Sequence, residues 1–263
     1  MESANAIELK KISKYFGEVI ANKNISLEVR KGEILSLLGE NGSGKTTLMN
    51  MLAGIYFPDE GEIIIDGKEV KITCPADAFQ LGIGMIHQHF KLIETFTAAE
   101  NIILGLPGKE IIKMNEVVEK INGLVNKYGF ELDPNKKIYN MSVSEKQTVE
   151  IVKMLYRGAN ILILDEPTAV LTPQETDRLF DVLRNMRNDG KAIIIITHKL
   201  HEVLSLSDRV AVLRKGEYIG TVQTKDATEL SLTEMMVGEK VTLDMGRQEP
   251  HDVKKKLEVK NLT

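Results

Sequence analysis

The chain has 263 residues, of which 43% are hydrophobic and 27% are charged, a composition typical of a globular protein that is long enough for two hydrophobic cores. No apolar run approaches the roughly 20 residues that span a bilayer, the N-terminus has no signal-peptide hydrophobic region, and one cysteine, Cys74, excludes an intrachain disulfide framework and suits the cytosol. The formal net charge of −4 argues against a dedicated nucleic-acid-binding protein, which usually carries a basic face.

A phosphate-binding pattern follows residues 7–29, which are expected to form antiparallel strands. An apolar, strand-like run at 34–38 leads into nine residues that fit the pattern G-x-x-x-x-G-K-[ST]. Apolar residues then recur at helical spacing until Gly54, which is expected to end the helix. The nine residues are Gly39, Glu40, Asn41, Gly42, Ser43, Gly44, Lys45, Thr46 and Thr47.

This strand–loop–helix arrangement predicts a phosphate-binding loop. The glycines allow successive backbone N–H groups to turn inward around an anion, and the helix N-terminus adds its partial positive charge. Lys45 is expected to neutralise the β- and γ-phosphates of a nucleotide, and the Thr46 hydroxyl is expected to bind Mg²⁺. The alternative is a glycine-rich turn that simply joins a strand to a helix.

A β-hairpin is predicted next, because Ile-rich residues 63–65 and the segment 69–72 flank the dipeptide Asp66-Gly67. This dipeptide favours a type I′ turn, in which both residues adopt a left-handed backbone conformation. The hairpin belongs with the earlier strands in an antiparallel part of the molecule.

Helical patterns dominate two later parts of the chain. From about residue 95 to 157 the pattern is helical and begins with a capping box, Thr97-x-x-Glu100. Near the C-terminus, a last helix is expected to be capped by Ser231-x-x-Glu234.

A second phosphate-handling motif lies at the ends of two buried strands. Residues 161–164 are predicted to form a parallel strand that ends in Asp165-Glu166, and residues 193–196 a strand that brings His198 to the same sheet edge. A carboxylate in this place can hold Mg²⁺, and the adjacent Glu166 can orient or polarise an attacking water. Alternatively, the two acids cap a helix and His198 is a surface histidine.

The order of these motifs resembles that of an ABC-transporter ATPase. A phosphate loop, a glutamine after an apolar strand, a helical stretch, a serine-containing signature, L-D-E-P and a strand-end T-H succeed one another along nearly the whole chain. The resemblance implies an α/β fold of the P-loop NTPase type, with a RecA-like core, an antiparallel β subdomain and an α-helical subdomain. It also implies ATP and Mg²⁺ as cofactors, and ATP hydrolysis coupled to transmembrane transport.

The resemblance further implies roles for individual side chains. Phe16 is expected to stack on adenine, Gln88 to reach Mg²⁺ and the attacking water while sensing the membrane partner, and His198 to contact the γ-phosphate. Asp165 is the expected metal ligand and Glu166 the catalytic carboxylate. From the residues alone, Phe16 could instead belong to the core and Gln88 to a plain loop.

The signature departs from the family's usual L-S-G-G-Q, because here it reads Met141-Ser142-Val143-Ser144-Glu145. In the family this loop opens a helix that grips the γ-phosphate of ATP bound by the opposite domain, and Ser142 keeps its hydroxyl. Ser144 restricts the backbone where glycine is free, and Glu145 is expected to add negative charge close to a phosphate. A weakened half-site is therefore predicted, and the alternative is a normal site with unusual residues.

Thr172 is another departure, since many family members have an aspartate there. Thr172-Pro173-Gln174-Glu175 reads as a capping box with proline at the first helical position. Thr172 is therefore expected to cap a helix, which places in doubt the cross-domain contact that the aspartate usually makes.

Within the family, the motifs at 85–90, 96–102 and 165–173 look like those of the importer branch for sugars and nucleosides. The resemblance implies transmembrane permease subunits and a second ABC domain as partners, a substrate-binding protein as an indirect partner, and a place at the cytoplasmic face of the membrane. Nucleosides are the first expected cargo, sugars the second and another small solute the third, and no nucleic-acid partner is expected.

An internal repeat completes the predicted organisation, because residues 257–263 parallel residues 7–13. We expect an ABC ATP-binding domain at 1–239, a linker at 240–256 and the start of a second ABC domain at 257–263, as in the first half of a fused subunit. Two other classes stay open, namely a soluble tandem ABC protein acting on ribosomes or nucleic acid, and a catalytically weakened regulatory domain.

Overall fold

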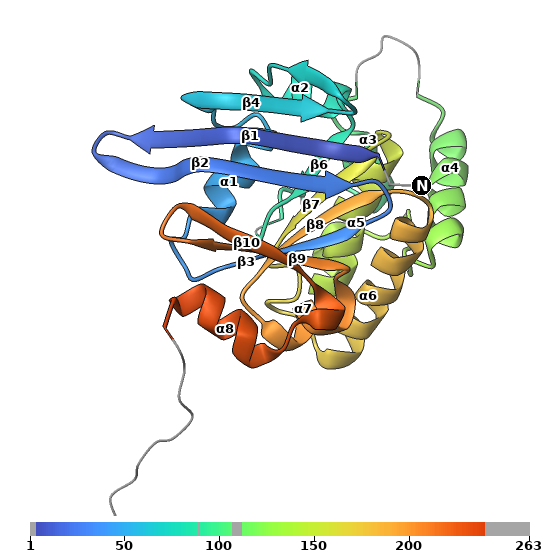
Figure 1. Cartoon of the computed structure of the whole chain (residues 1–263). Coiled ribbons are helices and arrows are strands. Elements are labelled where there is room, and N and C mark those ends of the chain that lie inside the picture. Colours follow the sequence, from blue (N-terminus) through green and yellow to red (C-terminus); the bar gives the residue numbers. More distant parts are fainter. Residues whose placement is uncertain (1–3, 89, 107–111, 240–263) are drawn as a thin grey trace, which may run out of the picture.

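The computed structural model describes residues 4–88, 90–106 and 112–239, which fold around two β-sheets with helices packed against them (Figure 1). The predicted linker and the predicted repeat, at 240–263, lie outside the described residues. Within the described part of the chain, no helix combines the length and the apolar character needed to cross a membrane.

The larger sheet carries the predicted site residues. Its strand order is β10-β9-β3-β8-β7-β6, and all neighbouring pairs are parallel except β10 with β9. Strands β3, β7 and β8 are almost entirely buried and apolar, as parallel strands covered on both faces require. Because they are parallel, the residues that follow them meet at one sheet edge. The strands are β3 (Ile34–Leu38), β6 (Ile83–Ile86), β7 (Ile161–Asp165), β8 (Ala192–Thr197), β9 (Arg209–Arg214) and β10 (Glu217–Gln223).

The smaller sheet is antiparallel throughout, with the order β2-β1-β4-β5, which confirms the predicted antiparallel subdomain. Asp66 and Gly67 join β4 to β5 with φ angles of 49° and 76°. Both values are left-handed, so the predicted type I′ turn is confirmed. The strands are β1 (Asn5–Phe16), β2 (Val19–Arg30), β4 (Glu60–Ile65) and β5 (Lys68–Val70).

Helix α1 (Lys45–Leu52) shares one hydrophobic core with both sheets. Its buried Leu48 and Met51 belong to the same cluster as apolar residues of β1 and β3. Gly54 follows the helix with a φ of 72°, a left-handed value that glycine adopts without strain, so the predicted helix end is confirmed. The phosphate-loop segment is thus held at both ends, by a buried strand and by a buried helix.

A second core covers the opposite face of the larger sheet and contains the helices of the predicted helical segment. Thr97 Oγ1 accepts a hydrogen bond from the Glu100 amide at 3.2 Å, and the Glu100 carboxylate accepts one from the Thr97 amide at 2.6 Å. The predicted capping box is therefore confirmed. The helices are α3 (Ala98–Ile103), α4 (Met114–Tyr128) and α5 (Val143–Tyr156).

The last helix begins earlier than its sequence pattern suggested. Thr228, not Ser231, is its N-cap, and Ser231 occupies the third helical position with its hydroxyl bonded back to the Thr228 amide at 2.9 Å. The prediction of a cap at Ser231 is wrong because serine serves as the reciprocal partner that Glu or Gln usually provides. The remaining helices are α2 (Pro75–Gln80), α6 (Pro173–Asn188), α7 (Leu200–Leu206) and α8 (Glu229–Val237).

The start of α6 supports a direct test of Thr172 as a helix cap. Thr172 Oγ1 accepts from the Glu175 amide at 3.3 Å, and the Thr172 amide donates to Glu175 at 2.9 Å. Thr172→Ala is expected to lower the free energy of unfolding by about 1 kcal/mol, whereas Thr172→Ser retains the cap. Urea unfolding measures both, and equal losses from the two variants would contradict a capping role.

Candidate functional site

The loop between β3 and α1 closes around the side chain of Lys45. Its Nζ donates to the backbone carbonyls of Gly39 at 2.7 Å and Glu40 at 2.9 Å, so the ammonium lies across the loop. Ser43 Oγ is buried and has no hydrogen-bond partner among the described residues. A phosphate oxygen bound in this loop would satisfy Ser43 and place an anion beside Lys45, so the residues present fit a nucleotide phosphate.

Close backbone approaches explain why two loop positions are glycine. Gly44 has a φ of 95°, and a Cβ there would collide with the Ala21 carbonyl and the Asn22 side chain. A Cβ at Gly39 would collide with the Leu213 carbonyl. Asn22 Nδ2 donates to the Gly44 carbonyl at 3.2 Å. Asn22 was not predicted as part of this site, because its distance along the sequence from the loop gives no sign of the contact.

Thr46 and Asp165 come together as the predicted metal ligands, with Thr46 Oγ1 donating to Asp165 Oδ2 at 3.4 Å. Burial raises the pKa of Asp165, and the neighbouring charge of Glu166 adds to this effect. Burial likewise lowers the pKa of Lys45, although both carboxylates oppose the shift. A cation beside Asp165 would favour its ionised carboxylate, and an anion beside Lys45 would favour its protonated ammonium. These oxygen ligands fit Mg²⁺, which completes its coordination with water and substrate phosphates.

Glu166 and His198 meet at the same sheet edge, as predicted from their strand ends. His198 Nδ1 lies 2.7 Å from Glu166 Oε1, and the Glu166 amide donates to the Ile196 carbonyl at 2.9 Å. Glu166 has a φ of 48°, a left-handed conformation that is strained for a residue with a long side chain. An ionised carboxylate only accepts hydrogen bonds, so His198 carries its proton on Nδ1 when Glu166 is charged.

Phe16 and Gln88 are placed at the surface rather than in the core. Phe16 is 43% exposed at the turn between β1 and β2, and its ring meets the Tyr56 ring edge-on at a centroid distance of 5.2 Å. Gln88 is exposed just after β6, whose neighbour β7 carries Asp165 at its end. The structure therefore removes the core alternative for Phe16, while the adenine and Mg²⁺ contacts stay predictions.

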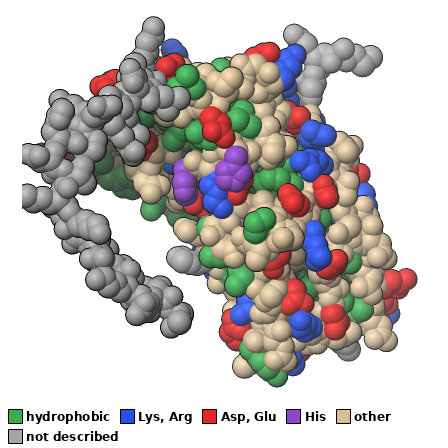
Figure 2. Space-filling view, turned by 90° about the horizontal axis from the view of Figure 1, so that it is seen from below, with side chains coloured by type: hydrophobic (Ala, Val, Ile, Leu, Met, Phe, Trp, Pro, Cys, Tyr) green, Lys and Arg blue, Asp and Glu red, His purple; other side chains and the backbone are tan. Residues whose placement is uncertain are grey.

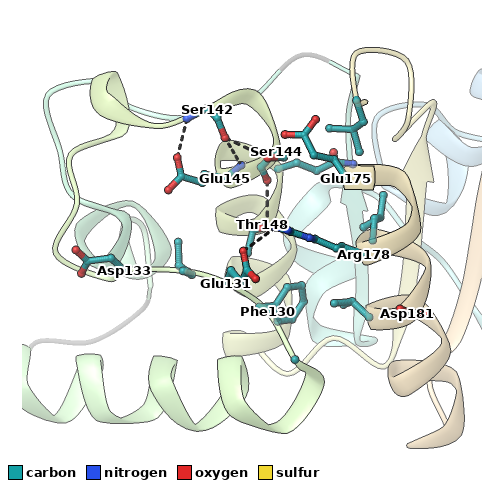
Figure 3. A pocket seen from close by; sticks show the side chains of 16 residues that line it. Phe130, Glu131, Asp133, Ser142, Ser144, Glu145, Thr148, Glu175, Arg178 and Asp181 are labelled. Carbon is teal, nitrogen blue, oxygen red and sulfur yellow. Dashed lines mark hydrogen bonds and ion pairs between the residues drawn. The ribbon is translucent and has the colours of Figure 1, made fainter. Parts of the chain in front are cut away.

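In the signature segment, the Glu145 carboxylate has partners within this chain. The Glu145 carboxylate accepts two bonds from Lys136 Nζ, at 2.7 and 2.9 Å. It also accepts one from the Ser142 amide at 2.8 Å (Figure 3). Burial opposes ionisation, but the bonds to Lys136 and Ser142 outweigh it and lower the pKa of Glu145. Its charge is therefore paired within the domain and lies at the helix start, and its effect on a phosphate bound by the opposite domain stays a prediction.

The backbone argument about Ser144 is corrected. Ser144 lies in the first turn of α5, where its conformation is helical and a glycine is not required. Ser142 is the N-cap, and its Oγ accepts from the Glu145 amide at 3.2 Å. The spacing Ser142-x-x-Glu145 is itself a capping box, so the sequence contained the signal that explains Glu145. Lys136 had no such signal, because the connection between α4 and α5 brings it close.

A cleft of about 630 Å³ lies beside the signature, between α5, α6 and residues 129–133 (Figure 3). Ser144 and Thr148 line one wall, and Thr148 Oγ1 donates to the Ser144 carbonyl at 3.1 Å. Arg178 of α6 reaches Glu131 at 2.9 Å across the cleft. The cleft was not predicted, since its walls come from segments that no motif connects.

A second cleft of about 280 Å³ lies between the larger sheet and the helical segment, and it is lined by His87, the residue before Gln88. Its floor is apolar and its sides carry charge from Lys91, Lys153 and Arg157 against one carboxylate, Glu150. Glu150 Oε1 accepts from the Lys91 amide at 3.0 Å, and Lys153 Nζ lies 3.9 Å from the same carboxylate. This cleft therefore has a positive balance and an apolar base.

Comparisons with known proteins agree with the arrangement. A family profile described as ABC transporter matches residues 22–169. The chain is 46% identical over 269 residues to the nucleoside import ATP-binding protein NupA of Lactococcus lactis subsp. cremoris, covering 100% of this chain and 52% of that protein. It is 43% identical over 274 residues to the glucose import ATP-binding protein TsgD13 of Haloferax volcanii, and this match covers 92% of this chain and 50% of that protein.

The chain thus spans about half the length of the curated relatives it matches. Among solved structures, an ATP-binding cassette of an ABC transporter in its ADP conformation superimposes with a TM-score of 0.79 at 27% identity, covering 89% of this chain and 99% of that one. The predicted fold class, a P-loop NTPase of the ABC ATPase type, is therefore confirmed.

Lys45 provides the sharpest test of the loop. Lys45→Ala removes a cation whose hydrogen bonds, among the described residues, go to two loop carbonyls, so the protein is expected to stay folded. A charged hydrogen bond contributes about 1.5–3 kcal/mol, so MgATP affinity should fall roughly 10- to 150-fold. A nucleotide titration measures the MgATP affinity and thermal unfolding measures whether the protein stays folded, with Lys71→Ala on the exposed surface as control. Unchanged affinity would show that the loop does not bind the nucleotide.

Proposed function

The chain belongs to the ABC transporter family, and on that premise we propose that it binds MgATP and hydrolyses it to power import of a small solute through a membrane permease. The observation that carries the proposal is the meeting of Lys45, Thr46, Asp165, Glu166 and His198 at one sheet edge. Their contacts bring a phosphate-binding loop, a metal-binding pair and a carboxylate–histidine pair together.

Each side chain has a distinct role in the proposed reaction. Lys45 neutralises the phosphates, and Mg²⁺, held by Thr46 and Asp165, supplies further positive charge when bound. Glu166 accepts a proton from the attacking water or polarises it, and His198 holds the carboxylate in place through Nδ1. Two further roles follow the family resemblance. Phe16 offers an exposed ring for adenine, and Gln88, which is exposed just after the strand that pairs with β7, is proposed to respond to the metal site.

A second ABC domain is proposed to complete each ATP site. Ser142 lies exposed at the start of α5, where its Oγ accepts from the Glu145 amide at 3.2 Å, and we propose that a phosphate bound by that domain approaches this capped helix start. Because Lys136 pairs with Glu145, the signature keeps a favourable helix start, and we propose that it takes part in hydrolysis rather than serving as a degenerate site. The length of the relatives supports a fused second domain.

Nucleosides are the proposed cargo, with sugars second, because relatives of comparable identity serve nucleoside and glucose import. The cargo would be delivered by a substrate-binding protein and recognised by permease subunits, with this protein at the cytoplasmic face of the membrane. On the face shown in Figure 2, acidic and basic side chains are interspersed, which does not favour the alternative of a nucleic-acid-directed protein.

We propose the cleft lined by His87 as the place where the permease docks. The apolar floor suits a short amphipathic segment of the permease. The net positive charge of Lys91, Lys153 and Arg157 suits a carboxylate on that segment. Burial lowers the pKa of Lys153, so an incoming carboxylate would gain a poorly solvated partner. Docking here would place the permease next to Gln88, and through it next to the nucleotide.

Hydrolysis can be separated from binding at Glu166. Glu166→Gln keeps the size of the side chain and removes its charge, so the full-length protein is expected to retain ATP affinity. A catalytic base contributes roughly 100- to 10,000-fold, and the turnover rate should fall within that range. The exposed Glu69→Gln is the matched control in an ATPase assay. Turnover equal to that of the parent would remove Glu166 from the mechanism.

Docking can be tested by reversing one charge at the cleft. Lys91 is exposed and its backbone amide, not its side chain, bonds Glu150, so Lys91→Glu should fold normally. A like charge facing a carboxylate is expected to weaken assembly with the permease at least about tenfold. Co-purification from membranes measures this, with Lys225→Glu beyond β10, the strand at the opposite edge of the larger sheet, as control. Equal loss from both variants would place the permease elsewhere.

A further inference from the structure

We propose that Thr168, Lys199 and Glu202 form a buried clasp that positions Glu166 and His198 for hydrolysis. The inference rests on the proposed ATPase activity and adds three positioning residues to it. Thr168 lies two residues after Glu166, and Lys199 directly follows His198, so the clasp joins the two loops that carry the reacting pair.

The clasp is a closed set of hydrogen bonds around one lysine and one carboxylate. Lys199 Nζ donates to the Thr168 carbonyl at 2.9 Å, to Thr168 Oγ1 at 3.2 Å and to Glu202 Oε1 at 2.9 Å. Thr168 Oγ1 donates to Glu202 Oε2 at 2.5 Å. All three ammonium hydrogens and both carboxylate oxygens therefore have partners within the clasp.

The polarity of the Thr168 hydroxyl is fixed by its two neighbours. An ammonium only donates and an ionised carboxylate only accepts, so the hydroxyl must accept from Lys199 and donate to Glu202. Thr168 is 2% exposed and Glu202 is 6% exposed, which shields these charge-assisted bonds from water. The clasp therefore requires a hydroxyl group that accepts one hydrogen bond and donates another, which an apolar side chain of the same shape cannot provide.

Glu166 and His198 differ in how firmly they are held, because the Glu166 side chain is 19% exposed and its amide donates to the Ile196 carbonyl, whereas His198 is exposed. The His198 side chain is 49% exposed, and its recorded side-chain bond is to Glu166. The backbone of Glu166 is strained at a φ of 48° and persists only if its surroundings hold it. The clasp supplies this hold, because it fixes Thr168 on one loop to Lys199 on the other.

A matched pair of variants separates positioning from folding. Thr168→Val keeps the shape and removes the hydroxyl, whereas Thr168→Ser keeps the hydroxyl. In the full-length protein with its permease, Thr168→Val is expected to lower kcat roughly 10- to 100-fold, since a misplacement of about 1 Å can cost about 100-fold. The KM for ATP should stay within about twofold, and Thr168→Ser should restore kcat. The exposed Thr95→Val, which removes a threonine hydroxyl outside the clasp, is the matched control.

The outcomes distinguish this inference from the proposed function. If the parent hydrolyses ATP and Glu166→Gln abolishes turnover, the proposed function holds, and a normal kcat in Thr168→Val would then overturn the clasp alone. A lower melting temperature with unchanged kcat, or a raised KM with unchanged kcat, would likewise overturn it. If Thr168→Val does not fold, Glu202→Gln, which keeps the volume and removes the charge, should show the same fall in kcat, and a normal kcat there would reject the proposal.

Discussion

Parallel pairing of β3, β8 and β7 is the constraint on which the rest of the site depends. Because the three strands run in the same direction, the phosphate loop, the acidic pair and the histidine emerge at one edge, although Thr46 and Asp165 are 119 residues apart in the chain and Glu166 and His198 are 32 apart. The apolar, doubly covered strands leave no freedom to shift register. The chemistry is thus a consequence of how hydrophobic strands must be buried.

Charge placement in the site and in the signature segment follows one rule, which is that a buried or half-buried charge lies beside a group that accepts from it or donates to it. Lys45 bonds loop carbonyls, Lys199 bonds Glu202 and Thr168, and Lys136 bonds Glu145. An unpaired buried charge is far more costly than a paired one. The same rule explains why an acid in the signature segment is compatible with a phosphate-binding helix start, because the acid is neutralised within its own domain.

Local patterns predicted local structure well. The phosphate loop, the Asp66-Gly67 turn and the Thr97 and Thr172 caps depend on residues that are close in sequence, and each was predicted from its spacing. The interpretation of Glu145 came from motif alignment and did not include its part in a capping box, although the spacing Ser142-x-x-Glu145 already indicated that contact. Asn22, Lys136 and the buried clasp were not predicted. Their contacts are made by tertiary packing, and neither periodicity nor spacing records such contacts.

The left-handed backbone at Glu166 has a consequence for the balance between stability and activity. A glycine or asparagine would adopt that conformation with less strain, so the resting fold would be more stable with a residue that lacks a carboxylate. The protein therefore keeps a locally unfavourable conformation in order to aim one acid at the sheet edge. Selection for thermal tolerance alone would be expected to remove this glutamate first, and a heat-resistant variant obtained in that way would be a poor choice of starting point for engineering transport.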